Sequence, residues 1–397
     1  MGYPHSHELE VGTILSRHFG DPKARDLTTW LTYGGYEGLK KALDMEPAEI
    51  TTVVKDSGLR GRGGAGFPTG LKWTFMPQEQ KGPHYLCCNA DESEPGAFKD
   101  REILRWVPHL LIEGCLIAAR AIHAEHAYIY VRGEYFPFTN ILNDAVVQAY
   151  EAGYIGKDIQ GSGWDCELTV HIGAGAYIAG EETGLMSSLT GGRAEPKIKP
   201  PFPAQSGVFG RPTTVNNVET LAAVPMIVVN GSDWYRQWGT EKSPGTKLWC
   251  CSGNLQRPGN YELALGVSLK DVIYEVCGGA PDGKRIKAVI PGGSSTALLT
   301  PEELDVPSTY EGLQEAGSSL GMASPIVLDE DVNIVRAMRR IADFYAHESC
   351  GQCVQCREGT SWVAKILKRI EVGDGRLSDL DTLYDLCEQL TGRTICV

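Results

Sequence analysis

Short apolar runs alternate with longer segments of helical spacing through the first half of the chain. The runs 85–89, 127–132 and 168–172 have the length and composition of strands. Between them, residues 108–123 and 139–152 place apolar side chains at the three- and four-residue intervals of a helix. Because strands that alternate with helices usually form a parallel sheet covered by helices, we predict an α/β layered domain with a largely parallel sheet.

The pattern differs on both sides of this unit. Residues 1 to about 55 are polar with helical spacing, and 196–212 is a proline-rich segment without regular structure. After Trp238, the segments 247–252, 269–276 and 286–290 have the pattern of short strands or helices between Gly and Pro turns, typical of a small α+β unit. Helical spacing returns over 332–344, 361–371 and 378–390. We predict three domains: an N-terminal helical segment with the α/β domain over 1–240, an α+β domain over 241–330 and a helical domain over 331–397.

Composition and charge limit the classes of partner. The 397 residues are 42% hydrophobic and 22% charged, an ordinary globular mixture, and the net charge of −13 argues against a nucleic-acid partner. No apolar stretch reaches the roughly 18 residues of a membrane-spanning helix. Met1–Glu10 lacks the basic start and apolar core of a signal peptide. We therefore expect a soluble chain that associates with a membrane only through partners.

A glycine-dense loop between residues 58 and 70 contains Gly61-Arg-Gly-Gly-Ala-Gly66, which matches G-x-G-x-x-G. The match alone is weak, and a flexible turn explains it equally well. The residues before it have helical spacing rather than a strand pattern, and Phe67-Pro68 argues against an immediate helix.

Polar segments later in the chain strengthen this motif. Asn89–Gly96 follows the first predicted strand, Gly173–Gly184 follows the third, and Thr213–Thr220 adds paired amides in a further loop. Ligands of open α/β sheets lie beyond the carboxyl ends of the strands. We therefore predict that these loops converge on one site, where glycines allow close approach of a phosphate and Asn and Asp side chains contact the edge of a flat heterocycle.

Three of the twelve cysteines form the run Cys350-x-x-Cys353-x-x-Cys356, which we predict to lie on one tight loop. In a chain without an export signal this concentration suggests a metal site rather than disulfides. Structural zinc more often uses two separated Cys-x-x-Cys pairs, whereas three close cysteines and a remote fourth suit a cubane iron–sulfur cluster. The cysteines inside apolar runs, such as Cys87 and Cys250, are expected to be small buried hydrophobes.

The fourth ligand has two candidates. Cys387 shares a helical stripe with Leu380, Leu383 and Leu390, a pattern typical of a packed core face. Cys396 follows Gly392-Arg-Thr-Ile in a segment without helical spacing. Spacing alone does not choose between them.

Several long motifs together resemble the flavin subunit of NADH:quinone oxidoreductase, respiratory complex I: Gly58–Trp73, Asn89–Gly96, Gly173–Gly184, Lys199–Ser206 and Glu348–Cys353. The resemblance covers nearly the whole chain in order. It implies hydride transfer from NADH to FMN, followed by single-electron transfer to a [4Fe–4S] cluster and onward toward quinone. The expected folds are a Rossmann-like domain, a ubiquitin-like soluble-ligand-binding domain and a C-terminal helical bundle that carries the cluster.

The resemblance also implies the cofactor contacts. The cluster ligands are expected to be Cys350, Cys353, Cys356 and Cys396, because the family's fourth ligand lies in a Gly-Arg-x-x-Cys context. A departure is Gln355, where family members usually carry proline. The expected FMN site consists of Gly61, Arg62, Gly64, Lys72, Asn89, Asp91, Glu92, Ser93, Tyr177, Gly180, Glu181, Asn216, Asn217 and Thr220.

For NADH, the resemblance places the adenine against Phe67, Phe75 and Phe202, although each alone would be interpreted as a core residue. The residues expected at the reacting end are Glu94, Tyr177 and Glu182. Carboxylates accept hydrogen bonds from a ribose diol and repel a 2′-phosphate, so Glu94 and Glu182 predict NADH over NADPH. Lys199 would balance the pyrophosphate. The alternative interpretation of each acid is an ordinary solvated charge on a loop.

The implied partners are a thioredoxin-like [2Fe–2S] subunit and a larger multi-cluster iron–sulfur subunit, at the cytoplasmic face of a bacterial cell membrane. A related alternative is the diaphorase subunit of an NAD-dependent hydrogenase or formate dehydrogenase. An alternative from a different class is a non-enzymatic scaffold whose cysteines bind zinc, but Asp91, Glu94, Glu182 and the cysteine set argue against it.

Overall fold

The computed structural model describes residues 7–12, 14–77 and 82–396. Its first sheet contains four parallel strands in the order β3-β2-β1-β4. The strands are β1 (Tyr85–Ala90), β2 (His126–Val131), β3 (Glu167–Ile172) and β4 (Thr213–Asn217). The three predicted strands and the parallel α/β architecture are confirmed. The prediction of a loop over 213–220 is wrong, because 213–217 pairs with β1 along its length and the next residues begin a helix.

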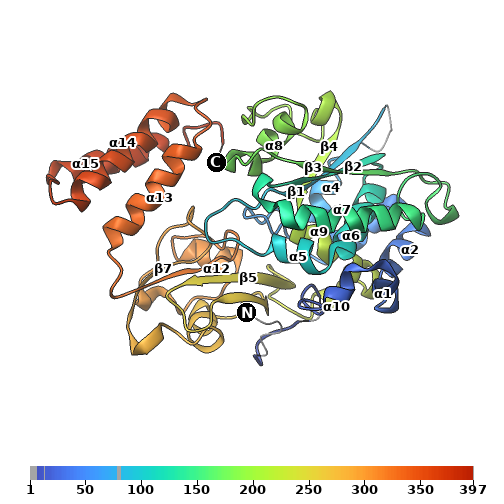
Figure 1. Ribbon diagram of the computed structural model, residues 1–397, viewed down its shortest axis with the longest axis horizontal. Helices are drawn as coiled ribbons and strands as arrows, with labels where there is room; N and C mark the ends of the chain where they lie inside the picture. Colours follow the sequence, from blue (N-terminus) through green and yellow to red (C-terminus); the bar gives the residue numbers. More distant parts are fainter. Residues whose placement is uncertain (1–6, 13, 78–81, 397) are drawn as a thin grey trace.

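Helices cover both faces of this sheet (Figure 1). Side chains alternate along β1, so Leu86 and Cys88 enter one core and Cys87 enters another on the opposite face. The first core also contains residues of α5 (Asp100–Trp106), α6 (Pro108–Ala121), α7 (Phe136–Glu151) and α9 (Val218–Asn230). The opposite core is closed by α8 (Glu182–Leu189). The predicted helices over 108–123 and 139–152 are confirmed as α6 and α7.

The N-terminal segment is helical only in part. The helices α1 (Leu27–Thr32), α2 (Glu37–Leu43) and α3 (Pro47–Asp56) are present, and α2 and α3 contact α6 and α9. Residues 7–12 and 14–21 contain no helix, and Glu10 instead pairs with Leu263 of the second sheet. The prediction of helix from residue 1 is therefore wrong for these residues, and residues 1–6 lie outside the described chain. The short helix α4 (Thr69–Trp73) begins directly after Phe67-Pro68, contrary to our expectation.

The second sheet is mixed, in the order β6-β5-β8-β7, and has a core of its own. Its strands are β5 (Thr246–Gly253), β6 (Gly259–Ala264), β7 (Ile286–Ile290) and β8 (Ile326–Asp329). The short helices α10 (Ser232–Tyr235), α11 (Leu269–Asp271) and α12 (Tyr310–Glu315) accompany it. The segments 247–252 and 286–290, predicted as strand or helix, are the strands β5 and β7, whereas β6 and β8 were missed. The buried polar residues Asn260 and Glu262 interrupt the apolar residues of β6, and β8 has only three apolar residues before Asp329.

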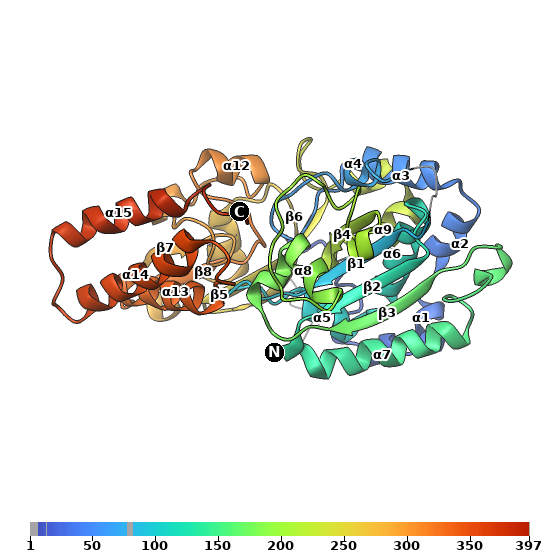
Figure 2. The ribbon, with the colours of Figure 1, turned by 90° about the horizontal axis from the view of Figure 1, so that it is seen from above.

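Three helices form an arm at one end of the molecule: α13 (Ile334–Glu348), α14 (Val354–Glu371) and α15 (Ser378–Leu390) (Figures 1 and 2). All three were predicted, but α14 begins earlier than expected, so Cys356 lies in its first turn rather than in a loop. The predicted core face on α15 is wrong. Cys387 and Leu380 are exposed, whereas Leu390 lies next to Gly359 on the side of α15 that packs against α14.

Two further expectations can be compared with the described chain. The seven cysteines outside the C-terminal segment are buried, as predicted: Cys87, Cys88, Cys115, Cys166, Cys250, Cys251 and Cys277. Within the described residues, no helix has both the length and the apolar character needed to span a membrane.

Candidate active site and cluster-binding site

The order of strands in the first sheet changes direction between β1 and β4. The chain adds β2 and β3 on one side of β1 and then places β4 on the other side. Ligands of open α/β sheets bind outside the carboxyl ends of the strands at such a switch point. Asn89 of β1 is directly in register with Asn217 of β4, so the predicted residues that end these two strands meet there.

Asp91, just after β1, is a buried carboxylate that lacks a hydrogen-bond donor among the described residues. Its side chain is 8% exposed, and neither oxygen accepts a hydrogen bond. Burial raises the pKa of Asp91 to about 7, despite the opposing attraction of Arg132. A buried acceptor without a donor costs about 1–3 kcal/mol. These oxygens therefore fit a ligand that presents an N–H group, as the isoalloxazine ring of FMN does.

The segment after β3 closes over the end of β1. The Asn89 amide donates to the Gly180 carbonyl at 2.8 Å. The Ser93 hydroxyl donates to the Tyr177 carbonyl at 3.4 Å. These contacts bring two of the predicted loops together at the switch point.

The glycine loop lies beside β4. The Gly61 N–H donates to the Phe67 carbonyl at 2.8 Å and closes the loop. A Cβ at Gly63 would lie 3.0 Å from the Asn217 Cβ, so this backbone runs close to the end of β4. Gly64 has φ +128°, and nothing lies within 4 Å of the place its Cβ would occupy. The loop thus leaves open space next to Asn217, where a phosphate or ring can approach the backbone.

Glu182, at the start of α8, is paired with two lysines. Lys72 Nζ lies 2.8 Å from one carboxylate oxygen and also donates to the Val215 carbonyl at 2.9 Å. Lys199 Nζ donates to the other oxygen. Burial alone would raise the pKa of Glu182, but Lys72 and Lys199 outweigh it and lower the pKa. The arrangement is an ionised carboxylate between two cations, while neighbouring Glu181 caps α8 by accepting from the Thr183 and Gly184 N–H groups.

Glu94 is held by both sheets. One carboxylate oxygen accepts from the Tyr177 hydroxyl at 2.7 Å, and the other accepts from the Ser295 N–H at 2.7 Å and the Ser294 hydroxyl at 3.3 Å. Burial, and next the charge of Glu94, raise the pKa of Tyr177, which keeps its hydroxyl a donor. Ser294 and Ser295 were not predicted. Their Gly-Gly-Ser-Ser run is an ordinary turn signal, and only the tertiary structure places it beside Glu94.

The three predicted adenine contacts are exposed rings. Phe67, Phe75 and Phe202 are 46%, 55% and 54% exposed, so they are not core residues. The Phe67 and Phe75 ring centroids lie 6.1 Å apart. Phe67 and Phe75 flank the helix that carries Lys72, and Phe202 follows Lys199 by three positions. Exposed aromatic faces of this kind can stack on a flat base.

Several predicted site residues instead use their side chains within the chain. The Arg62 guanidinium is buried and donates to the Tyr235 hydroxyl and to the carbonyls of Pro244 and Thr246. The Glu92 carboxylate is also buried and caps α5, accepting from the Lys99 and Asp100 N–H groups. The resemblance to the family predicts which positions lie near the cofactor, but the direction in which each side chain points depends on its neighbours in this chain. These two side chains therefore hold the loops in place.

The amide and hydroxyl groups along β4 and α9 are likewise engaged. Asn216 accepts from the Trp73 indole N–H at 2.9 Å, and Thr220 accepts from the Arg62 N–H at 2.8 Å. Asn217 caps α9 and donates to Asp100 at 2.6 Å. Their remaining donor and acceptor positions are what a ligand at the switch point could use.

Cys350, Cys353, Cys356 and Cys396 lie together where α13, α14 and the C-terminal segment meet. Cys353 is the N-cap residue of α14, and its sulfur accepts from the Ile395 N–H at 3.4 Å. Burial, and then the charges of Cys356, Cys350 and Cys353, raise the pKa of Cys396.

This donor set fits an iron–sulfur cluster. Four mutually repelling thiolates near a helix N-terminus suit a cationic iron centre. No group of three His, Cys, Asp or Glu side chains in the described chain is arranged around a single ion. The thiolates of a four-iron cluster stand farther apart than the ligands of one ion. The Gln355 side chain donates to the Arg393 carbonyl and ties the Cys396 segment to α14, whereas Cys387 is exposed on α15.

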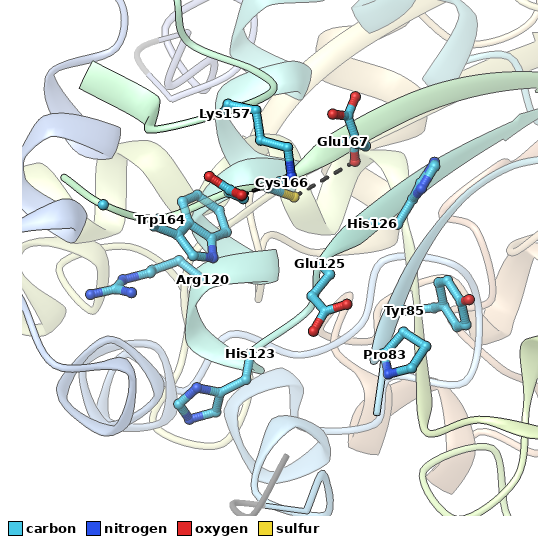
Figure 3. A pocket seen from close by; sticks show the side chains of 12 residues that line it. Pro83, Tyr85, Arg120, His123, Glu125, His126, Lys157, Trp164, Cys166 and Glu167 are labelled. Atoms are coloured by element: carbon cyan, nitrogen blue, oxygen red, sulfur yellow. Dashed lines mark hydrogen bonds and ion pairs between the residues drawn. The ribbon is translucent and has the colours of Figure 1, made fainter. Parts of the chain in front are cut away.

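A polar groove of about 680 Å³ lies at the opposite end of the first sheet (Figure 3). Tyr85, His126 and Glu167, at the starts of β1, β2 and β3, line it. Among its charged residues, Lys157 pairs with Asp165 at 2.8 Å. None of the predicted site residues lines this groove. The candidate site is therefore identified by the types of side chain that meet there and not by the size of a cavity.

Known proteins share both parts of this arrangement. The Nuo51 FMN-binding domain matches residues 54–226, an SLBB domain matches 250–298, and the NADH-ubiquinone oxidoreductase-F iron-sulfur binding region matches 336–397. The F subunit of NADH-quinone oxidoreductase from Mycobacterium tuberculosis is 52% identical over 390 residues, 96% of this chain and 87% of that protein. The chain belongs to the family of NADH-quinone oxidoreductase F subunits. The resemblance found in the sequence is thereby confirmed.

Other members and one related structure extend the comparison. The F subunit from Escherichia coli K12 is 48% identical over 373 residues, 93% of this chain and 84% of that protein. The crystal structure of an NAD+-reducing [NiFe]-hydrogenase in the H2-reduced state has a TM-score of 0.83 and 39% identity. It covers 94% of this chain, which spans 62% of that hydrogenase chain.

The family assignment agrees with the placement of the two groups of residues. As a member of this family, the chain is an oxidoreductase flavin subunit with FMN and a [4Fe–4S] cluster as cofactors. The FMN-binding match includes the glycine loop, the loop after β1, the segment after β3 and β4. The iron–sulfur match includes all four clustered cysteines.

Proposed function

We propose that this chain takes hydride from NADH onto FMN and passes the electrons singly to a [4Fe–4S] cluster, and from there to partner subunits toward quinone. The observation that carries the proposal is the buried, unpartnered carboxylate of Asp91 at the switch point of the FMN-binding region. FMN, when bound, supplies the chemistry that accepts two electrons and releases them one at a time. The residues of the chain bind, orient and exclude water.

In this proposal, residues at the ends of β1 and β4 would hold FMN. Asp91 would accept a hydrogen bond from the ring N–H, and Asn89, Asn216 and Asn217 would contact its polar edge. The open backbone at Gly64 admits the ring or its phosphate. The further FMN contacts are Gly61, Arg62 through its main chain, Lys72, Glu92 through its main chain, Ser93, Tyr177, Gly180, Glu181 and Thr220.

NADH enters from the side of the exposed rings. Phe67, Phe75 and Phe202 stack on the adenine, and Lys199 lies near the pyrophosphate. Glu182, held ionised between its lysines, accepts from the ribose diol and repels a 2′-phosphate. Glu94 and Tyr177 orient the reacting end of the nucleotide.

The cluster is held by Cys350, Cys353, Cys356 and Cys396. Two of these thiols occupy the N-terminal turn of α14, where the helix dipole favours negative charge. Each thiol deprotonates to bind iron.

The finer architecture and assembly are also proposals. We assign a Rossmann-like domain to residues 1–240, a ubiquitin-like domain to 241–330 and a helical cluster domain to 331–397. The parallel sheet with its switch point and the SLBB match support the first two. The partners are a thioredoxin-like [2Fe–2S] subunit and a larger multi-cluster subunit, at the cytoplasmic face of a bacterial membrane.

A second candidate function is that of the diaphorase part of a soluble hydrogenase or formate dehydrogenase. The similarity to the NAD+-reducing hydrogenase chain favours it. Metal analysis of the complex isolated from its natural source separates the two. Nickel or molybdenum at stoichiometric amounts supports the second candidate, and quinone reduction without either metal supports the first.

The proposed function is tested by absorbance of anaerobically purified protein before and after addition of NADH, with NADPH in parallel. We expect NADH but not NADPH to bleach a flavin band, with a reduced-cluster electron paramagnetic resonance signal. A colourless protein with stoichiometric zinc would contradict the redox function and support the scaffold alternative. Bleaching by both nucleotides would contradict only the role of Glu182 in selecting NADH over NADPH.

A further inference from the structure

We propose that Tyr345 on α13 is a positioning residue that, through Ser294, sets the orientation of Glu94 and couples the nucleotide site to the cluster-binding segment. The inference rests on the proposed function, because it assigns Glu94 to the nucleotide. It adds a residue from the C-terminal arm and a loop of the second sheet to a site otherwise built on the first sheet.

The coupling begins at the loop that follows β7. Ser294 is 8% exposed, and its hydroxyl lies 2.8 Å from the Tyr345 hydroxyl and 3.3 Å from a Glu94 oxygen. The loop is held against the first sheet, since the Ser294 N–H donates to the Pro95 carbonyl at 3.1 Å. A Cβ at Gly293 would lie 2.6 Å from the Glu94 side chain, so only glycine allows this approach.

Glu94 retains capacity for a ligand in this arrangement. A carboxylate has about four acceptor positions, and Tyr177, Ser294 and Ser295 use three. Three donors fix the plane of the carboxylate and therefore the direction of the remaining position. The Tyr345 hydroxyl matters because it determines which way the Ser294 hydroxyl points.

The same turn of α13 reaches the cluster segment. Tyr177 packs edge-on against the rings of Phe344 and Tyr345, at centroid distances of 5.3 Å and 5.7 Å. The Tyr177 N–H donates to the Glu348 carboxylate at 3.0 Å. Glu348 is the last residue of α13, and Cys350 follows it by two positions. A nucleotide that moves Glu94 or Tyr177 therefore acts on the helix that leads into the first cluster ligand.

Tyr345→Phe tests the inference, because it removes one hydroxyl and keeps the ring packing. We expect the KM for NADH to rise about two- to tenfold, because one neutral hydrogen bond is lost. The kcat with ferricyanide as electron acceptor should be nearly unchanged. In holoprotein reduced with dithionite, we expect added NAD+ to change the cluster's electron paramagnetic resonance spectrum in the wild type and not in the variant. The matched control is Tyr384→Phe, which removes an exposed hydroxyl from α15 and should behave as the wild type.

A second pair of variants tests the same inference if Tyr345→Phe fails to fold. Ser294→Ala should reproduce the effects of Tyr345→Phe, and Ser294→Thr, which keeps the hydroxyl, should restore NADH affinity. FMN and iron contents of each variant are measured first. An unchanged KM and an unchanged NAD+ response in Tyr345→Phe or Ser294→Ala would overturn the inference, as would a wild-type spectrum insensitive to NAD+. Failure of NADH to bleach the wild-type flavin would instead contradict the proposed function itself.

Discussion

Four carboxylates follow the strands of the first sheet, and the surroundings of each determine what it can do. Glu182 lies between two lysines, Glu94 accepts from three donors, and Glu92 caps a helix. Asp91 is buried without a donor. The sequence presents all four as similar loop acids, and only Asp91 is left with an unmet need for a hydrogen bond.

Asp91→Asn should change how stability depends on pH in deflavinated protein. The folded-state pKa of about 7 exceeds the unfolded value of about 3.9. The contribution of Asp91 to the free energy of unfolding is therefore fully present below about pH 3.9, where the group is protonated in both states, and is lost as pH rises through 7. Relative to the variant, the wild type should lose about 2 kcal/mol of unfolding free energy between pH 5.5 and 8. Urea titrations at the two pH values measure this, and parallel pH slopes would contradict it.

At the scale of elements, the glycine loop shows why its motif was ambiguous. It connects α3 to α4 rather than a strand to a helix, so the usual context for G-x-G-x-x-G is absent. Its place beside β4 depends on the pairing of β4 with β1. The sequence did not indicate β4, because its Thr and Asn residues do not form an apolar run.

Gly64→Ala tests whether this loop holds FMN. The added Cβ points into open space, but φ +128° is a conformation that L residues rarely adopt, with a cost of about 1–3 kcal/mol. Gly163→Ala is the control, since Gly163 also has a positive φ (+73°) and open space but lines the groove at the far end of the sheet. We expect both variants to lose stability and only Gly64→Ala to bind FMN at least about tenfold more weakly, the effect of roughly 1.4 kcal/mol. Fluorescence titration of deflavinated protein with FMN measures the affinity, and equal FMN affinity in the two variants would exclude the loop from the site.

At the scale of the whole molecule, a buried ionic network joins the two sheets. Four charged side chains of this network are at most 1% exposed: Lys99 and Asp100 at the start of α5, Glu219 of α9 and Lys247 of β5. Lys99 Nζ lies 2.6 Å from Asp100 and 2.9 Å from Glu219, which also pairs with Lys247. Burial lowers the pKa of Lys247 to about 8, although Glu219 opposes this. Nothing in the sequence distinguishes these residues from surface charges.

Glu219→Gln should destabilise the protein strongly. It leaves Lys99 and Lys247 buried close together with less compensating charge, and breaking a buried ion pair costs about 3–5 kcal/mol. The exposed pair Lys157–Asp165 provides the control, since Lys157→Ala should have a much smaller effect on stability. Thermal and urea unfolding of the two variants measure the difference. Similar losses in both would show that the network contributes little to the union of the two sheets.

Short-range patterns were sufficient for most of the helices, for three strands of the first sheet and for the family resemblance. Helical spacing and apolar runs are local properties, and three of the four clustered cysteines lie close together in the chain. The same local reasoning failed for β6, β8 and the exposed stripe of Cys387. Whether an apolar or polar residue is buried depends on what packs over it.

The residue types along the chain were enough to indicate an α/β sheet and an iron–sulfur site, because these depend mainly on groups that lie near one another in sequence. The flavin and nucleotide site was implied by the resemblance of several separate motifs to a known family. The tertiary structure decided which groups meet. Lys72 and Glu182 are 110 positions apart, and Ser294 and Glu94 are 200 positions apart. It also decided that Arg62 and Glu92 point into the protein while Asp91 lacks a partner. Such pairings arise from packing between distant segments, for which no local pattern exists.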